Sequence, residues 1–587
     1  MTFWWSLLVL ILGVSTATLF PTSRAEAKYT AQVDGDSLVL TGDNKGDALA
    51  VRLTAGDPTH LDIDVGDDGT ADFNFDRSLF TAIAIHAGAG RDTIRIDEAN
   101  GLFTDEAITI DGGPGNDTIT GGSGDDTILG GDGNDVIDPR RGADTVDGGP
   151  GNDQLIWDPG DGSDVFEGGD GNDVLVFNGS NANEKFDFSA NGARTRMTRD
   201  VASITMDMSN VEEVDLKTLG GTDTVTVNDL TGTQLALVSV DFASFDGGPD
   251  GAVDTVVMTG TAGPDVVSVG ATNGVLEVDG VTTQVQVTSP EGTDAVQFVT
   301  QAGDEVHVLG TPGPDTIGIA PSPTPDAIRS FSDLFPVGID VSGVGKLVVF
   351  GLGGDDMIVG QNGLRSRGVA LEIDGGAGDD TLTGGDGDDV IFGGGGDDTI
   401  RGGIGSDTVF CGPGKDTAIW NPGDGSDTIE GDGGQDTLLF NGSNAAESID
   451  LSANGSRLRL FRNVASITMD VNAVEQIQVR ALGSADDITV NDLAGTDVKT
   501  VGIDLAGFDG SGDGAVDTVR VNGTNDVDRF ALKPTATGVS VKRKNLEVDV
   551  DRPETTDSLV VNGLGGGDKF VVDPGVTTAI SLTLNPD

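Results

Sequence analysis

The sequence has very few of the residues that usually cross-link a chain of this size or compensate its negative charge. Cys411 is the single cysteine among 587 residues, so an internal disulfide is impossible. Lys and Arg number 33 against 97 Asp and Glu, which gives a net charge of −64. A nucleic-acid-binding protein needs a basic surface to displace the counterions of phosphates, so this class is excluded. Cations are the expected partners instead.

Aromatic residues and helical patterns are also scarce, whereas glycine is abundant. Aromatics make up 5% of the chain, and the 91 glycines make up about 15%, against a usual ~7%. Segments such as 211–230, VEEVDLKTLGGTDTVTVNDL, alternate apolar and polar residues between turn-forming ones. Such alternation predicts short β-strands. The chain is therefore expected to be all-β, either a stacked solenoid or a set of β-sandwiches, and we favour the solenoid.

The chain contains two copies of an array with a nine-residue period. Residues 112–156 form five such units, beginning GGPGNDTIT and GGSGDDTIL; an eleven-residue unit (157–167) and a further nine-residue unit (168–176) follow. The same succession returns at 375–439, at a constant offset of 263 residues that also relates the flanking segments. We therefore expect two tandem superunits. The expected organisation is a signal peptide at 1–27, an N-terminal β region at 28–110, a first array at 111–176, a β-rich inter-array region at 177–373, a second array at 374–439 and a C-terminal β-rich region at 440–587.

Comparing the fourteen units shows which positions are required. The fourth residue is Gly and the sixth is Asp in every unit, while the fifth varies widely. An invariant Gly indicates positive φ or close approach to a neighbour. The eighth residue is always apolar, as expected for one inward side chain on a short strand. Each unit is therefore a turn followed by a strand.

Stacking these units brings carboxylates together. Two units make a coil of about eighteen residues, which places Asp117 above Asp135 and Asp126 above Asp144 at about the 4.8 Å strand spacing. Two carboxylates about 5 Å apart repel by roughly 0.8 kcal/mol in water and about 3 kcal/mol at an effective dielectric of 20. A cation between the turns would reverse this repulsion. Oxygen ligands in flexible turns suit Ca²⁺ better than Mg²⁺, and the scattered histidines and single cysteine do not suit zinc.

The units closely resemble the hemolysin-type calcium-binding repeat, GGxGxDxUx with U apolar, of the RTX family. The resemblance covers about 130 residues and implies a parallel β-roll in which Ca²⁺ is shared between turns of neighbouring coils. It implies that backbone oxygens and the position-six carboxylates are the ligands. These aspartates are Asp117, Asp126, Asp135, Asp144, Asp153, Asp164, Asp173, Asp380, Asp389, Asp398, Asp407, Asp416, Asp427 and Asp436.

Four of these aspartates stand in irregular units. Arg140 and Arg141 are expected to place positive charge beside Asp144, and Lys415 to do so beside Asp416. The eleven-residue units are expected to break the register around Asp164 and Asp427. For these four, a metal-free turn is the more serious alternative.

Acidic turns outside the arrays carry weaker signals. Residues 64–72, DVGDDGTAD, are similar to an EF-hand loop, but position three is Gly66 and position twelve is Phe75, so an acidic surface turn is the favoured interpretation. Asp92 and Asp355 lie in solitary turns at the 263-residue offset, and we expect them to be structural.

The first residues suggest export. The apolar run at 4–14 is followed by Ala25-Glu26-Ala27, which fits a signal-peptidase site and predicts a mature amino terminus at Lys28. An uncleaved anchor is the alternative, although the run is short for a spanning helix. No membrane span is expected after signal removal.

No catalytic motif is found, because HExxH, GxSxG and P-loop patterns are missing from the sequence. We therefore expect a non-enzymatic, secreted or cell-surface calcium-binding protein without catalytic residues or an organic cofactor. Its role would be structural, with a possible cell-surface or matrix partner. Alternatives are an adhesin that recognises ligands through 177–258 and 440–521, and a hydrolase with an unrecognised acidic site.

Overall fold

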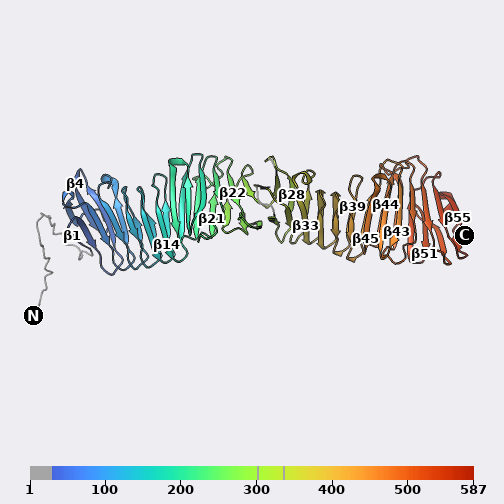
Figure 1. Cartoon of the computed structure of the whole chain (residues 1–587), viewed down its shortest axis with the longest axis horizontal. Helices are drawn as coiled ribbons and strands as arrows, with labels where there is room; N and C mark the ends of the chain where they lie inside the picture. Colours follow the sequence, from blue (N-terminus) through green and yellow to red (C-terminus); the bar gives the residue numbers. More distant parts are fainter. Residues whose placement is uncertain (1–28, 301–302, 325, 335–336, 587) are drawn as a thin grey trace, which may run out of the picture. The chain divides into compact units, whose positions relative to one another are not determined.

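The computed structural model describes residues 29–300, 303–324, 326–334 and 337–586, which are predominantly β-strand and turn (Figure 1). The expected signal peptide at 1–27 lies outside the described residues. The chain divides into two compact units, Met1–Asp254 with Thr282–Ser289, and Thr255–Val281 with Pro290–Asp587. Within each unit, successive coils contribute strands to two sheets that are mostly parallel.

In the first unit, the strands of one sheet pair in the order β1 (Thr30–Asp34), β2 (Ser37–Thr41), β6 (Ala82–His86), β8 (Ala107–Asp111), β10 (Thr127–Leu129), β12 (Thr145–Pro150), β14 (Val165–Asp170), β18 (Ile204–Ser209), β17 (Arg194–Arg199), β16 (Lys185–Asn191) and β20 (Thr224–Val227). The other sheet contains β5 (Phe73–Asp76), β4 (Asp57–Val65), β3 (Ala48–Thr54), β7 (Thr93–Asp97), β9 (Thr118–Thr120), β11 (Val136–Asp138), β13 (Gln154–Trp157), β15 (Val174–Ser180), β19 (Glu213–Leu219), β21 (Leu237–Asp241) and β25 (Gln284–Thr288).

In the second unit, one sheet contains β22 (Thr255–Thr259), β26 (Ala295–Val299), β30 (Gly338–Ser342), β29 (Ala327–Ser332), β28 (Thr316–Pro321), β32 (Met357–Gly360), β34 (Thr381–Asp386), β36 (Thr399–Ile404), β39 (Thr417–Trp420), β42 (Thr437–Asn441), β46 (Gln476–Leu482), β48 (Thr500–Gly507), β52 (Leu546–Asp551), β51 (Gly538–Arg543), β50 (Arg529–Pro534) and β54 (Lys569–Val572). The other contains β24 (Val275–Asp279), β23 (Val266–Thr272), β27 (Glu305–Leu309), β31 (Lys346–Phe350), β33 (Ala370–Ala377), β35 (Val390–Gly395), β37 (Thr408–Phe410), β40 (Thr428–Glu430), β45 (Ile467–Asn472), β44 (Arg457–Arg462), β43 (Ser448–Asn454), β47 (Asp487–Val490), β49 (Thr518–Asn522), β53 (Ser558–Asn562) and β55 (Ser581–Asn585).

The core is a set of apolar rows that run along each stack. The position-eight side chains of neighbouring coils are in register, so that Ile119, Ile137, Leu155 and Leu175 form one fully buried row. On the other sheet, Ile128, Val146 and Phe166 form a second buried row. These rows arise because a strand directs alternate side chains to opposite faces. The prediction of an all-β parallel solenoid with two tandem superunits is confirmed.

An antiparallel insertion follows each array. In the first unit β16, β17 and β18 fold back on one another before parallel stacking resumes, and β43, β44 and β45 do the same in the second. Trp157 stacks on Phe177 with ring centroids 4.0 Å apart, and Trp420 stacks on Phe440 at 4.2 Å. The 263-residue duplication therefore extends to the packing at the end of each array.

Helical structure is minor. The structure contains short 3-10 turns and one α-helix, α1 (Val576–Ala579), within the described residues. Nowhere in the described part of the chain does a helix reach the length and apolarity that crossing a membrane requires.

Candidate metal centre

All fourteen position-six aspartates lie inside the turns. Each immediately precedes the strand of its unit, and none is more than 6% exposed. A buried carboxylate must be compensated by hydrogen-bond donors or a cation, because transferring an unpaired charge out of water is very costly. The partners of these carboxylates therefore decide what the turns can bind.

One oxygen of most carboxylates is held by the neighbouring coil. The backbone N–H of Asp117 donates to Oδ1 of Asp135 at 2.7 Å, and that of Asp135 donates to Oδ1 of Asp153 at 2.8 Å. In the second array, the N–H of Asp380 donates to Oδ1 of Asp398, and that of Asp398 donates to Oδ1 of Asp416, both at 2.8 Å. The expected stacking of aspartates is therefore observed, and backbone amides support it as well.

The remaining oxygen has no such support. In thirteen of the fourteen aspartates, all except Asp427, one buried carboxylate oxygen has no hydrogen-bond partner among the described residues. It is Oδ1 in Asp126 and Oδ2 in the others. Leaving a buried acceptor unsatisfied costs about 1–3 kcal/mol, and more when it is charged. A row of such oxygens fits a row of cations.

At the turns that begin with Gly130 and Gly375, a backbone carbonyl oxygen lies near the free carboxylate oxygen. A Cβ added to Gly130 would lie 2.5 Å from Oδ2 of Asp135 and 2.5 Å from the carbonyl oxygen of Gly148. At Gly375 the corresponding distances are 2.4 Å to Oδ2 of Asp380 and 2.5 Å to the Gly393 oxygen. The first glycine thus leaves room where carboxylate and carbonyl oxygens converge.

The donor set suits Ca²⁺. Within the described residues, no group of three or more His, Cys, Asp or Glu side chains could hold a metal ion. A bound ion would therefore complete its shell with backbone carbonyls and water, as Ca²⁺ does with its six to eight oxygen ligands. The residues present fit this ion.

The fourth glycine permits the close stacking of turns. A Cβ on Gly133 would lie 1.3 Å from the carbonyl oxygen of Gly115, and one on Gly151 would lie 1.5 Å from that of Gly133. Gly133 also has φ of 141°, a conformation that side chains rarely adopt. Both reasons that the sequence offered for this glycine therefore apply at Gly133.

Burial changes the acidity of these carboxylates. The principal cause is desolvation, and neighbouring carboxylates add to it at most of them. Burial raises the pKa of Asp153 and Asp407 to about 6, of Asp126, Asp135, Asp164, Asp380, Asp389, Asp416 and Asp427 to about 7, and of Asp144 to about 8. It also raises the pKa of Asp117, Asp173, Asp398 and Asp436. Desolvation, more than the mutual repulsion considered from the sequence, therefore opposes ionisation.

The irregular units are more regular in space than their sequences indicated. Arg140 pairs with Asp138 at 3.6 Å. Lys415 is exposed, and its backbone N–H donates to Oδ1 of Asp397 at 2.9 Å. These contacts do not bring the charge of Arg140 or Lys415 onto the carboxylates of Asp144 and Asp416, beside which the sequence analysis expected it.

The two extra residues of the eleven-residue unit do not disturb the row. They are taken up in a local turn in which the N–H of Asp161 donates to the carbonyl of Asp158 at 3.0 Å. The N–H of Asp144 still reaches Oδ1 of Asp164 at 2.8 Å, and that of Asp407 reaches Asp427 at 3.0 Å. The expected break in register is wrong at both places.

A second ladder at position five escaped the sequence analysis. The N–H of Asn152 donates to Oδ1 of Asn134 at 3.1 Å, and that of Asp397 donates to Oδ1 of Asp379 at 2.8 Å. In this ladder the N–H donates to the preceding coil, whereas the N–H of a position-six aspartate donates to the following coil. The frequent Asn and Asp at position five is the signal that could have revealed them.

The aspartate row also continues beyond the arrays. Asp92, Asp223, Asp356 and Asp486 are at most 2% exposed, and each has an Oδ2 without a partner in the described residues. Asp356 rather than Asp355 corresponds to Asp92, because Asp356 is buried and Asp355 is exposed. The signal in the sequence is an Asp two residues before the first buried apolar residue of a strand.

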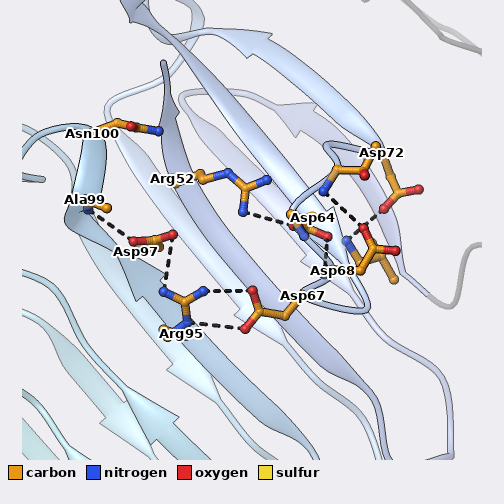
Figure 2. A network of polar contacts seen from close by, with 12 residues as sticks. Arg52, Asp64, Asp67, Asp68, Asp72, Arg95, Asp97, Ala99 and Asn100 are labelled. Carbon is orange, nitrogen blue, oxygen red and sulfur yellow. Dashed lines mark hydrogen bonds and ion pairs between the residues drawn. The ribbon is translucent and has the colours of Figure 1, made fainter. Parts of the chain in front are cut away.

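Two aspartates of the acidic turn at 64–72 pair with arginines (Figure 2). Asp64 pairs with Arg52 at 2.9 Å and accepts the N–H of Gly69 at 2.7 Å. Asp67 pairs with Arg95 at 2.7 Å. These contacts favour the interpretation of an acidic surface turn over a separate calcium loop.

Comparisons with known proteins identify the repeats of the two arrays. The family model described as RTX calcium-binding nonapeptide repeat (4 copies) matches residues 109–137, 140–155, 160–181, 374–409 and 423–444. The structure of the extracellular lipase LipA from Serratia marcescens aligns with 14% identity and a TM-score of 0.15, covering 68% of this chain and 43% of the lipase. No curated protein matches. RTX nonapeptide repeats bind Ca²⁺, and the two arrays of this chain carry this hemolysin-type calcium-binding repeat.

Proposed function

We propose that the protein is a secreted structural solenoid whose two arrays complete their folding when Ca²⁺ binds between stacked turns. The observation that carries this proposal is the row of buried carboxylate oxygens without a partner in the described residues. Bound Ca²⁺ supplies positive charge to these oxygens. In the metal-free arrays the same oxygens oppose assembly, so metal binding contributes directly to folding free energy.

The fourteen position-six aspartates are the proposed side-chain ligands. Each would bind through the oxygen that the neighbouring coil does not use, together with nearby backbone carbonyls such as that of Gly148. The segments 111–176 and 374–439 are accordingly the proposed calcium modules, and 28–110, 177–373 and 440–587 are β-rich flanking regions.

Circular dichroism on the full chain tests the coupling of Ca²⁺ to folding. We expect strand content to fall when Ca²⁺ is removed with EDTA and to return when excess Ca²⁺ is added. Mg²⁺ at the same concentration is the control, and it should restore much less because it demands tighter octahedral geometry. Equal strand content with and without Ca²⁺ would refute the coupling.

Secretion is the proposed location because the extracellular medium offers millimolar calcium and because residues 1–27 have the pattern of a signal peptide. A reporter carrying residues 1–30 should be exported. Retention of that reporter in the cell would contradict this part of the proposal.

An adhesive role is the alternative, and one observation favours it. Phe245 and Phe508 occupy equivalent loops at the 263-residue offset, and they are 87% and 88% exposed. Exposed aromatics retained in both copies suit recognition of a surface or matrix partner. Replacing both with serine should reduce attachment without changing calcium binding if the protein is an adhesin.

We propose no catalytic role. A surface hollow of about 350 Å³ is lined by Gln478, Arg480, Asp504, Asp551 and Arg552. Asp504 there is ion-paired with Arg552, and Asp551 accepts a hydrogen bond from Thr537. The aspartates with strongly raised pKa belong instead to the stacked turns, which supports a structural rather than a hydrolytic use of these acids.

A further inference from the structure

The second residue of each turn decides what faces the buried carboxylate. In most regular turns this residue has positive φ, for example 107° at Gly131 and 96° at Gly376. Gly122 is an exception, and its N–H donates to Oδ2 of Asp126 at 2.8 Å, which leaves Oδ1 as the oxygen without a partner among the described residues. In the turns of Gly131 and Gly376 the carboxylate is that of Asp135 or Asp380, and its Oδ2 receives no hydrogen bond from any described residue. The turn therefore leaves an anionic oxygen open to a cation.

Threonine at this position closes the turn instead. The N–H of Thr311 donates to Oδ2 of Asp315 at 2.6 Å, and its hydroxyl donates to Oδ1 at 3.1 Å. In the same way, the N–H and hydroxyl of Thr524 donate to Oδ2 of Asp528 at 2.6 and 2.9 Å. These donors occupy the oxygens that a cation would need, and hydrogen bonds to a charged acceptor are among the stronger ones.

Serine closes the turn that follows each array. Ser180 donates its N–H to Oε2 of Glu184 at 2.8 Å and its hydroxyl to Oε1 at 3.0 Å, while Arg199 forms a buried ion pair with the same Glu184. Ser443 and Arg462 contact Glu447 in the second copy. At these two positions an arginine supplies the positive charge that pairs with the buried glutamate.

The turn 351–356 lies one coil before the second array and keeps the open arrangement. Leu352 occupies its second position with φ of 72°. Asp356 is 2% exposed, its Oδ1 accepts the N–H of Asp315 at 2.8 Å, and its Oδ2 has no partner in the described part of the chain. A Cβ on Gly351 would lie 2.3 Å from this Oδ2 and 2.3 Å from the carbonyl oxygen of Gly375. The two oxygens thus converge as they do in the arrays.

The turn before the first array shares the open carboxylate oxygen and the positive φ at its second position, with Ala87 in place of glycine at its first position. Asp92 is fully buried, its N–H donates to Oδ1 of Asp117 at 2.7 Å, and its Oδ2 is without a partner among the described residues. Gly88 holds the second position with φ of 100°. Neither this turn nor the turn 351–356 falls in the ranges that the repeat family matches.

We propose that the turns ending in Asp92 and Asp356 bind Ca²⁺ as additional sites, whereas the turns closed by Thr311 and Thr524 bind none. This inference rests on the proposed calcium binding of the arrays. It extends each row of ions by one coil at its amino-terminal end. It also makes the flanking coils that carry threonine turns independent of calcium.

Counting bound Ca²⁺ on the full chain by flow dialysis tests the proposal. Asp356→Asn and Asp92→Asn should each bind at least one ion fewer than the parent protein. Asp315→Asn is the matched control and should bind the same number, because its carboxylate already has donors from Thr311. An unchanged count in Asp356→Asn, or a reduced count in Asp315→Asn, would overturn the inference.

Asp398→Asn separates this inference from the proposed function. If Asp398→Asn loses ions and Asp356→Asn does not, only the additional sites are refuted. If neither variant loses ions, calcium binding by the arrays fails as well.

A second variant covers the possibility that Asp356→Asn does not fold. Leu352→Thr introduces a hydroxyl donor at the second position, and a β-branched residue disfavours positive φ. It should close the turn, keep the strand content seen by circular dichroism and lose at least one ion. A folded Leu352→Thr protein with the full count would contradict the role assigned to position two.

Discussion

At the scale of the residue, the two oxygens of a position-six aspartate have separate tasks. In Asp398, Oδ1 accepts the N–H of Asp380 at 2.8 Å, while Oδ2 has no partner within the described chain. The first contact sets the register of the coils, and the second oxygen remains for the metal. This division explains why the sixth position tolerates only Asp.

Asp398→Asn should weaken calcium-dependent folding. The amide keeps an acceptor for Asp380 but loses the negative charge, so the Ca²⁺ concentration at the folding midpoint should rise roughly tenfold, about 1.4 kcal/mol. Asp397→Asn is the matched control, since Asp397 is exposed and its bond from Lys415 needs only a carbonyl-type oxygen. Calcium titrations followed by circular dichroism measure both. Equal midpoints in the two variants would contradict the assignment.

Gly133→Ala should destabilise the first array by about 3 kcal/mol even with Ca²⁺ present. A methyl group there would meet the carbonyl oxygen of Gly115, and the residue has φ of 141°. Gly345→Ala is the control, because no atom lies within 4 Å of its added Cβ. Urea unfolding in calcium measures the difference, and comparable stabilities for both variants would argue against tight stacking of the turns.

At the scale of the element, the nine-residue period predicted a great deal. It indicated the turn, the strand, the buried position-eight row from Ile119 to Leu175 and the stacking of Asp117 on Asp135, because all of these follow from local spacing. It did not reveal the N–H donated by Asp117 or the ladder through Asn134 and Asn152. Those bonds join residues 18 or more apart, so they depend on the register between coils.

The local sequence also gave a wrong indication of which carboxylate Arg140 contacts. Arg140 stands four residues before Asp144, yet it pairs with Asp138, because a side chain in a turn can point outward while the sixth residue points inward. The contrast between Thr311 and Gly131 at position two was visible in the sequence. Its meaning needed the hydrogen bonds of the folded turn.

The insertion after each array should depend on a buried ion pair. Glu184 and Arg199 are 1% and 3% exposed, and Arg199 also lies over the ring of Trp157 at 5.3 Å. Arg199→Met should cost about 3–5 kcal/mol, since it leaves a buried carboxylate unpaired. Adding Glu184→Gln should recover much of this loss. A double-mutant cycle by urea unfolding measures the coupling, and strictly additive effects would contradict the pairing.

At the scale of the whole molecule, the metal-free protein should become less stable as pH rises. The pKa of Asp144 is about 8 and that of Asp135 about 7 in the folded state, against about 3.9 for an unfolded aspartate. The folded chain therefore binds more protons than the unfolded chain between pH ~4 and ~8, and its free energy of unfolding falls across that interval.

Urea unfolding in metal-free buffers at pH 5, 6, 7 and 8 checks this dependence. The midpoint should decrease steadily toward pH 8, where most carboxylates of the rows are charged. In saturating Ca²⁺ the trend should reverse, because protons then compete with the metal. A metal-free midpoint that increases with pH would contradict the burial of ionisable, uncompensated aspartates.

The duplication gives the chain two calcium arrays, and the coils that flank them have both open turns, as at Asp92 and Asp356, and closed turns, as at Asp315 and Asp528. The net charge of the chain is −64, and its stacked aspartates have buried carboxylate oxygens without a hydrogen-bond partner among the described residues. We therefore regard calcium as the element that makes such a charge compatible with a stacked solenoid, and this is the central claim.

Crystallography of the full chain grown in saturating CaCl₂ tests that claim most directly. We predict anomalous-scattering peaks in rows along both arrays, each about 2.3–2.6 Å from the free carboxylate oxygen of a position-six aspartate. Ordered turns without such peaks, or aspartates turned outward into solvent, would contradict it.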